Sequence, residues 1–253
     1  MTPWKHDTSY SFTAPLDGGG EATHTVFVKG SGKEGAPPIL ILQELPGIGA
    51  ETDALADRLI DAGFSVYLPH LLGPLGRANR LTTALNTARL LCIRREFNIF
   101  LHGRQSPVAA WIRALCEDIA ARSGSARIGV IGMCLTGSFA IPLMAEASVM
   151  GAVASQPALP IRHHDTLHMS ATEVTSACHA MQFKGPALAM RYEGDKIASA
   201  AHMQALKGAF GEHLDVREFP GNAHSLLTLD FSEAAYAAMQ DYFSERLGTR
   251  EPA

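Results

Sequence analysis

The sequence has few cysteines, no dominant charge and no long apolar run, and each of these absences argues against a class of protein. The 253 residues carry a formal net charge of −4, which gives no electrostatic reason to expect nucleic acid or an anionic membrane as a partner. The four cysteines form no C-x-x-C pair and no zinc-like spacing. No apolar stretch approaches the roughly 20 residues that a membrane-spanning helix needs.

The first residues, MTPWKHDTSYSF, also lack the basic and apolar segments of a secretory signal peptide. We therefore expect a cytoplasmic protein with free thiols, because a reducing compartment suits unpaired cysteines. The expected state is a monomer or a small homo-oligomer. What the sequence does contain is an ordinary globular composition, 47% hydrophobic and 18% charged.

Apolar runs typical of strands alternate with segments of helical periodicity along most of the chain. This pattern predicts strands at 23–29, 38–43, 64–68, 127–131, 149–155, 187–191 and 214–219. It predicts helices at 51–62, 106–122, 135–147, 197–210 and 231–247. Strand–helix–strand units cross over with a right hand and make parallel pairs. We therefore predict one domain over residues 1–253, a doubly wound and mostly parallel α/β sheet flanked by helices.

One segment interrupts the alternation. Residues 157–183 are polar and rich in histidine and serine, and we expect them to form a small cap-like insertion.

A cysteine stands where a predicted strand meets a predicted helix, in GVIGMCLTG. Cys134 follows Gly132 by two residues and precedes Gly137 by three, which matches the sharp turn of a nucleophile elbow with sulfur in place of the serine oxygen. The helix end also favours a thiolate. A buried cysteine is more often a small core residue, so this motif alone is weak.

Two further residues strengthen the case for a nucleophile. Asp195 lies in the loop after the strand 187–191, and His224 lies in the loop after the strand 214–219. Both loops belong at the carboxyl edge of a parallel sheet, and the order nucleophile, acid, histidine is the one that an elbow architecture requires. We predict that His224 exchanges the proton and that Asp195 orients it.

An elbow nucleophile also needs donors for the oxyanion. One should be the N–H of the residue that follows it, Leu135, and the second should come from the loop after the strand 38–43. That loop has the sequence QELPG, so we predict Leu45 as the second donor.

Taken together, these motifs resemble the dienelactone hydrolases of the α/β-hydrolase superfamily. The resemblance runs from LILQELPGIGAETDALADRLIDAGFSVYLPHLLG through GVIGMCLTG and RYEGD to FPGNAHS. It implies an α/β-hydrolase fold and a Cys-His-Asp hydrolase of small esters or lactones that needs no cofactor. It also implies that Glu44, the glutamate of the Q-E pair, contacts the resting Cys134 and takes part in its activation.

The sequence departs from the family pattern at three points that bear on function, one of which is the long interval from Cys134 to Asp195 that includes the insertion 157–183. Thr136 stands where the family usually has a glycine. The family's arginine that binds a substrate carboxylate soon after the histidine is also missing, because residues 225–245 contain no arginine or lysine. Arg80 or Arg94 are the candidates to replace it, with Arg77 and Arg95 in the same segment.

Other features of the sequence have weaker interpretations. The run RHHDTLH at 162–168 contains three histidines and an aspartate, but its spacing does not favour a metal site and we predict none. Cys92, Cys116 and Cys178 are expected to be inert core thiols. Two alternatives to a lactone hydrolase remain: a general carboxylesterase or thioesterase acting on uncharged substrates, and a non-catalytic thiol sensor or binding protein.

Overall fold

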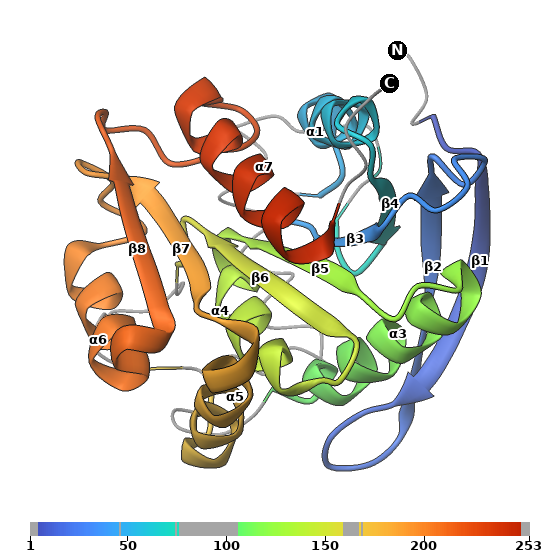
Figure 1. Cartoon of the computed structure of the whole chain (residues 1–253), viewed down its shortest axis with the longest axis horizontal. Helices are drawn as coiled ribbons and strands as arrows, with labels where there is room; N and C mark the ends of the chain where they lie inside the picture. The colour runs from blue at the N-terminus through green and yellow to red at the C-terminus, as the bar shows by residue number, and fades with distance from the viewer. Residues whose placement is uncertain are drawn as a thin grey trace.

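Eight strands form a single sheet in the computed structural model, in the order β1-β2-β4-β3-β5-β6-β7-β8 (Figure 1). The structure describes residues 5–45, 47–73, 75, 106–158, 167 and 169–248. The strands are β1 (Thr8–Pro15), β2 (Glu21–Lys29), β3 (Pro38–Leu42), β4 (Ser65–Pro69), β5 (Ile128–Met133), β6 (Val149–Ser155), β7 (Ala187–Tyr192) and β8 (Leu214–Phe219). The six strands from β4 to β8 in this order are parallel, as the sequence predicts.

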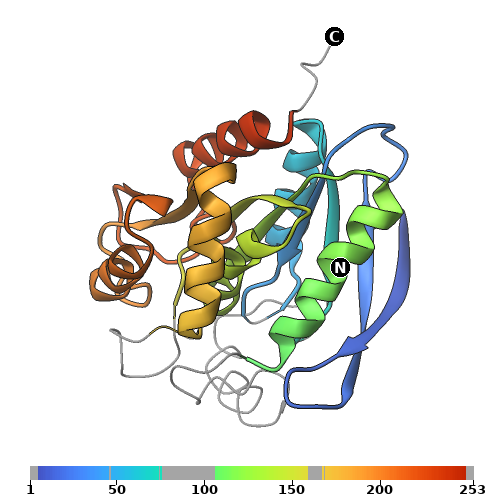
Figure 2. The same ribbon diagram turned by 60° about the horizontal axis from the view of Figure 1, so that its bottom comes forward.

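Helices cover both faces of the sheet (Figures 1 and 2). They are α1 (Ala50–Asp61), α3 (Val108–Ser123), α4 (Gly137–Ala140), α5 (Ala171–Lys184), α6 (Ala200–Phe210) and α7 (Glu233–Leu247), with 3-10 turns η1 (Cys134–Thr136), η2 (Ile141–Ala145) and η3 (Gly211–His213). The helices α1 and α7 share one apolar core with the sheet. The helices α3, α5 and α6 share the other.

The central strands supply side chains to both cores. In β3, Ile39 and Ile41 pack with α1 and α7, whereas Leu40 and Leu42 pack on the opposite face. Every residue of this strand is buried. Successive side chains of a strand point to opposite faces, so a strand covered on both sides requires a continuous apolar run. This is the reason that the unbroken run PILIL predicts the strand correctly.

The first strand, β1, is not among the strands that the sequence pattern predicts. It pairs antiparallel with β2 at the edge of the sheet, and its exposed residues alternate with Tyr10, Phe12 and Ala14. That period of two is the usual sign of a half-buried strand. The hydroxyl of Tyr10 donates to Asp118 of α3 at 2.9 Å, which fastens the hairpin to the helix layer.

The helix predicted at 135–147 differs from the structure. Three short helical segments, η1, α4 and η2, replace one regular helix. Pro142 lies in this stretch and has no N–H to continue a helical hydrogen-bond ladder. The chain therefore changes helical geometry near the proline before it reaches β6.

The segment 157–183 is in part an ordinary layer helix. Its second half forms α5, which begins with a capping box between Ser170 and Glu173 and buries Ala177 and Met181 in the core. Residues 159–166 and 168 lie outside the described residues, so a cap formed by them stays a prediction. Among the helices that the structure describes, none is long and apolar enough to cross a membrane.

Candidate active site

The parallel strands bring their carboxyl ends to one edge of the sheet, and the predicted site residues follow these ends. Glu44 lies just after β3 and Cys134 just after β5, while Asp195 and His224 lie in the loops after β7 and β8. The edge of an open α/β sheet at its carboxyl ends is where ligands bind.

Cys134 occupies a strained turn. Its φ of 53° lies in the left-handed region, which costs a non-glycine residue about 1–3 kcal/mol and is typical of functional sites. The turn leaves no space for a side chain at Gly132, where a Cβ would lie 2.4 Å from the carbonyl oxygen of Thr136. The glycine two residues before Cys134 is therefore required by the close approach of the backbone.

Thr136, the departure from the family pattern, is completely buried and ties the elbow to β3. Its Oγ1 accepts a hydrogen bond from the Met133 N–H at 2.9 Å. The same hydroxyl lies 2.8 Å from the Leu42 carbonyl oxygen and 3.1 Å from that of Gln43. The threonine thus connects the turn that carries Cys134 to the start of the loop that carries Glu44 and Leu45.

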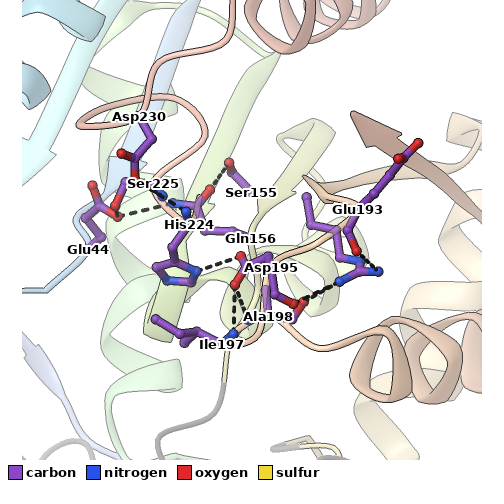
Figure 3. A network of polar contacts seen from close by, with 11 residues as sticks. Glu44, Ser155, Gln156, Glu193, Asp195, Ile197, Ala198, His224, Ser225 and Asp230 are labelled. Atoms are coloured by element: carbon purple, nitrogen blue, oxygen red, sulfur yellow. Dashed lines mark hydrogen bonds and ion pairs between the residues drawn. The ribbon is translucent and has the colours of Figure 1, made fainter. Parts of the chain in front are cut away.

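Asp195 and His224 form a hydrogen-bonded pair. Asp195 Oδ2 lies 2.7 Å from His224 Nδ1, as Figure 3 shows. The other carboxylate oxygen, Oδ1, accepts the N–H groups of Ile197 at 2.7 Å and Ala198 at 3.1 Å. Both oxygens are therefore fixed, so the carboxylate has one orientation toward the imidazole ring.

The two loops that carry this pair contact each other. The N–H of Gly194 donates to the carbonyl of Gly221 at 2.8 Å, and a Cβ at Gly194 would lie 2.9 Å from that oxygen. On the histidine side, Asp230 Oδ2 accepts the N–H groups of His224 and Ser225 at 3.3 and 3.2 Å. Asp230 therefore fixes the backbone of the histidine loop.

A buried arginine fixes the aspartate loop. The guanidinium of Arg191, only 3% exposed, donates to the carbonyl oxygens of Glu193 at 3.0 Å, Ala198 at 2.9 Å and Asp195 at 3.2 Å. Its Nε pairs with Glu218 at 2.6 Å. The arginine therefore holds the loop around Asp195 through hydrogen bonds to its backbone carbonyl oxygens.

The imidazole has a strongly perturbed proton affinity. Burial opposes its charged form, but the Asp195 hydrogen bond and the nearby Cys134 thiol outweigh burial and raise the pKa of His224 to about 10. Burial by itself would raise the pKa of Asp195. The His224 hydrogen bond and the N–H groups of Ile197 and Ala198 outweigh burial and hold this pKa below its usual range. The pair therefore favours an imidazolium beside a carboxylate.

Nε2, the ring nitrogen that faces away from Asp195, is buried and makes no hydrogen bond of standard geometry within the described part of the chain. The Cys134 thiol is near enough to raise the imidazole pKa, yet it does not complete such a bond. Nε2 is consequently available to exchange a proton with the nearby thiol.

Glu44 is a buried carboxyl with polar partners on both oxygens. Oε2 contacts Gln156 Nε2 at 3.1 Å and Ser225 Oγ at 3.2 Å, and Oε1 contacts the hydroxyl of Thr228. Burial raises the pKa of Glu44 despite these hydrogen bonds. Among the described residues no hydrogen bond joins Glu44 to Cys134, and the part of Glu44 in activating Cys134 stays a prediction.

Gln43, the other member of the Q-E pair, faces the opposite way. Its amide accepts the N–H of Leu71 at 2.9 Å and donates to the carbonyl of Leu72 at 2.6 Å. Gln43 therefore holds the chain that follows β4 against the end of β3.

A cleft of about 470 Å³ opens beside the histidine pair. Leu45 lines it, as do Ile197 and Leu229, apolar side chains that are 54% and 37% exposed. Lys196 and His224 are the basic residues among the lining residues that the structure describes. The cleft can therefore receive an apolar substrate group next to the imidazole.

Several predicted residues lie beyond the described part of the chain. These are Cys92, the four candidate arginines Arg77, Arg80, Arg94 and Arg95, and all the histidines of RHHDTLH. Of the other cysteines, Cys116 is fully buried, as predicted, and Cys178 is half-buried. Burial raises the pKa of both thiols. Among the described residues, no three potential ligands of the His, Cys, Asp or Glu type gather as a metal site.

Sequence reasoning missed five residues that hold the site: Gln156, Arg191, Ser225, Thr228 and Asp230. Ser225 adjoins His224 in the sequence, and this neighbouring position could have marked it as a site residue. Gln156 and Thr228 are recognisable only once the strand order is known, because each contacts Glu44 from another strand or loop. Arg191 and Asp230 act on backbone atoms of nearby loops, for which the sequence has no local motif.

Comparison with known proteins agrees with this fold. No curated protein matches the chain, but many solved structures do. An esterase of Pyrococcus furiosus is 12% identical, with a TM-score of 0.61 over 95% of this chain and 91% of that one. A dienelactone hydrolase-like promiscuous phosphotriesterase from metagenomic libraries is 17% identical, with a TM-score of 0.63 over 95% and 99%. A dienelactone hydrolase of Anabaena variabilis is 16% identical, with a TM-score of 0.58 over 95% and 98%.

At these identities the solved structures establish the α/β-hydrolase fold. The family assignment comes from the sequence itself, because residues 25–246 match the family described as the dienelactone hydrolase family. This span includes every strand from β3 to β8 and all the residues of the site described above. The chain therefore belongs to the dienelactone hydrolase family, and it is a hydrolase of carboxylic esters.

Proposed function

We propose that the chain is a cysteine-dependent hydrolase of small esters or lactones that works through an acyl-thioester on Cys134. The observation that carries the proposal is the 2.7 Å contact between Asp195 and His224 at the sheet edge where Cys134 occupies a strained φ of 53°. A strained nucleophile, a base and an orienting acid at one edge are the parts that an elbow hydrolase needs.

In the proposed reaction, His224 Nε2 takes the proton of the Cys134 thiol. Sγ then attacks the carbonyl carbon and forms a C–S bond while the carbonyl oxygen takes up the electron pair. The N–H groups of Leu45 and Leu135 donate to this oxyanion. The C–O bond to the leaving group then breaks, and His224 Nε2 protonates the departing oxygen. Because the Asp195 hydrogen bond raises the pKa of His224, the imidazole carries this proton at neutral pH.

Water completes the cycle. The neutral His224 removes a proton from water as the oxygen attacks the thioester, and the C–S bond breaks to release the carboxylic acid and regenerate the sulfur. Glu44 is the fourth proposed member. Burial raises the pKa of Glu44, so its neutral form persists to higher pH and does not repel a thiolate on Cys134.

The experiment follows hydrolysis of cis- and trans-dienelactone by ultraviolet absorbance, with 4-nitrophenyl acetate as a second substrate. The variant Cys134→Ala should lower turnover about 1000-fold or more, because it removes the nucleophile. The matched control is Cys178→Ala, which removes a half-buried thiol from α5 and should leave turnover unchanged. Unchanged turnover in Cys134→Ala would exclude the mechanism.

A second candidate substrate class is an uncharged ester or thioester. Residues 225–245 contain no arginine or lysine, and the hydroxyls of Ser225 and Thr228 are directed at Glu44. The exposed Ile197 and Leu229 contribute apolar surface to the described wall of the cleft. Under this alternative, nitrophenyl esters are hydrolysed faster than the carboxylated lactones, and both activities depend on Cys134.

A non-catalytic thiol sensor is the alternative proposal outside the enzymes. It predicts that Cys134 reacts with an oxidant such as hydrogen peroxide while no ester is turned over. The same assay distinguishes it, because Cys134-dependent turnover of any ester excludes a purely non-catalytic role.

A further inference from the structure

Gln156 is strained in the same way as Cys134. It follows the last residue of β6 and has a φ of 36°. In the described part of the chain, Cys134 and Gln156 are the two non-glycine residues with positive φ. Its N–H donates to the carbonyl of Met190 in β7 at 2.6 Å, and its side chain is completely buried. A conformation that costs stability and is held in place by the sheet is typical of a functional position.

The amide of Gln156 has a fixed orientation. The hydroxyl of Ser155 donates to Oε1, and Nε2 donates to Glu44 Oε2 at 3.1 Å, as Figure 3 shows. Oε2 also accepts the hydroxyl of Ser225 at 3.2 Å, so it is an acceptor in this arrangement and the amide group that faces it is the donor. Gln156 therefore presents a donor, and only a donor, to Glu44.

This contact crosses the end of the strand that carries the nucleophile. Glu44 follows β3 and Gln156 follows β6, and β5 lies between these two strands in the sheet. The carboxyl end of β5 is Met133, and Cys134 comes next. A side-chain bridge between the neighbours on either side of β5 thus fixes Glu44 relative to the elbow.

The bridge also decides where Glu44 can carry a proton. An amide N–H can only donate, so it keeps Oε2 as an acceptor, a role that the hydroxyl of Ser225 supports at 3.2 Å. The other oxygen, Oε1, faces the Thr228 hydroxyl, which can either donate or accept. The proton of the neutral carboxyl therefore belongs on Oε1.

We propose that Gln156 is a positioning residue of the hydrolytic site that acts through Glu44, holding Oε2 as a fixed acceptor so that the carboxyl exchanges its proton at Oε1. This inference rests on the proposed function, because it assigns Gln156 a part in controlling the group beside the nucleophile. It requires no contact between Gln156 and the substrate.

The test uses two variants of the full chain. Gln156→Leu has nearly the same size but no donor. Gln156→Asn keeps an amide and tolerates a positive φ, yet it is one methylene too short to reach Glu44, so it keeps the proposal testable if the leucine variant does not fold. Both should lower kcat/KM for 4-nitrophenyl acetate about tenfold, since the buried carboxyl of Glu44 loses the hydrogen bond that positions it. The control is Ser138→Ala, which removes a buried hydroxyl without a hydrogen-bond partner among the described residues.

Two readouts separate positioning from a structural role. Loss of the donor disfavours the carboxylate and raises the pKa of Glu44 further, so the limb of the kcat/KM profile that disappears in Glu44→Gln should move to higher pH in Gln156→Leu. In the Glu44→Gln background, Gln156→Leu should add no more than a twofold loss, because the two residues act as one unit.

Independent, multiplying losses in the double variant would overturn the proposal, as would wild-type kcat/KM and an unmoved pH limb in both Gln156 variants. Failure of the proposed function is a different result. In that case the wild-type chain itself has no Cys134-dependent turnover, whereas failure of this inference leaves that turnover intact.

Discussion

The hydroxyl of Thr136 lies 2.8 Å from the carbonyl oxygen of Leu42, so a residue of the elbow is bonded to the strand next to its own. The same oxygen accepts the N–H of Met133 at 2.9 Å. One buried hydroxyl thus joins the end of β5 to the end of β3. The separation in sequence is 94 residues, and the contact sets the distance between Cys134 and the loop that carries Leu45.

Replacement of this hydroxyl should be costly. Thr136→Val keeps the shape but leaves the Met133 N–H without its acceptor, so we expect a loss of about 1–3 kcal/mol in the free energy of unfolding. Turnover should fall as well, because the elbow and the oxyanion loop lose their connection, and Thr136→Ser should retain both. Urea denaturation and ester hydrolysis measure the two effects. Thr175→Val, at an exposed position of α5, is the matched control and should change neither.

The raised pKa of His224 predicts a pH-dependent stability. The folded pKa of about 10 exceeds the ordinary value of 6.5, so the stabilisation is fully present below pH 6.5 and is lost as the pH rises toward 10. We expect the free energies of unfolding of the wild type and of His224→Gln to approach each other as the pH rises from 6 to 10. Their difference should fall by up to about 1.4 kcal/mol per pH unit, and denaturation at a series of pH values measures it. A stability difference that stays constant across this range contradicts the raised pKa.

The orientation of the imidazole should depend on Asp195. Asp195→Asn keeps the size but removes the charge that raises the pKa of His224, and it favours the wrong tautomer. We expect kcat for ester hydrolysis to fall about 100- to 10,000-fold, with the pKa of His224 lowered in an NMR titration. Asp215→Asn, at a half-buried position of β8 that pairs with Arg217, serves as the control. Retention of wild-type kcat would show that Asp195 has no orienting role.

Arg191 should act on activity through the backbone of the aspartate loop. Arg191→Lys keeps the charge but cannot reproduce the planar fork that reaches three carbonyl oxygens. The expected cost is about 1–3 kcal/mol of unfolding free energy, with kcat reduced more than KM is changed. Denaturation and steady-state kinetics test this. The control is Arg217→Lys, since Arg217 is exposed and pairs within its own strand, where ion pairs contribute little.

The buried strands and the order of the site residues are predictable from the sequence for a physical reason. A strand covered on both faces must be apolar throughout, as in PILIL, and a parallel sheet brings Cys134, Asp195 and His224 to one edge whatever its strand order. The edge strand β1 was missed although Tyr10, Phe12 and Ala14 alternate with polar residues. The broken helix after Cys134 was predicted as continuous, because apolar periodicity outweighed the local effect of Pro142.

The supporting residues were beyond sequence reasoning. Gln156 and Glu44 meet only because β6 and β3 flank β5, and strand order is not encoded in any local pattern. From the sequence alone, Arg191 would be expected at the surface, as most arginines are. It is buried because three carbonyl oxygens of one loop accept hydrogen bonds from its guanidinium. The roles of Leu45 and Leu135 as oxyanion donors stay predictions for the kinetic tests.

The two positive-φ residues at the ends of adjacent strands, Cys134 and Gln156, have a consequence for engineering the enzyme. Selection for heat resistance alone will favour glycine or asparagine at both positions, because these residues adopt such conformations at lower cost. Each of these changes removes a side chain on which the proposed chemistry depends. A thermostability screen that does not also select for turnover will therefore accumulate stable variants of reduced activity at these two sites first.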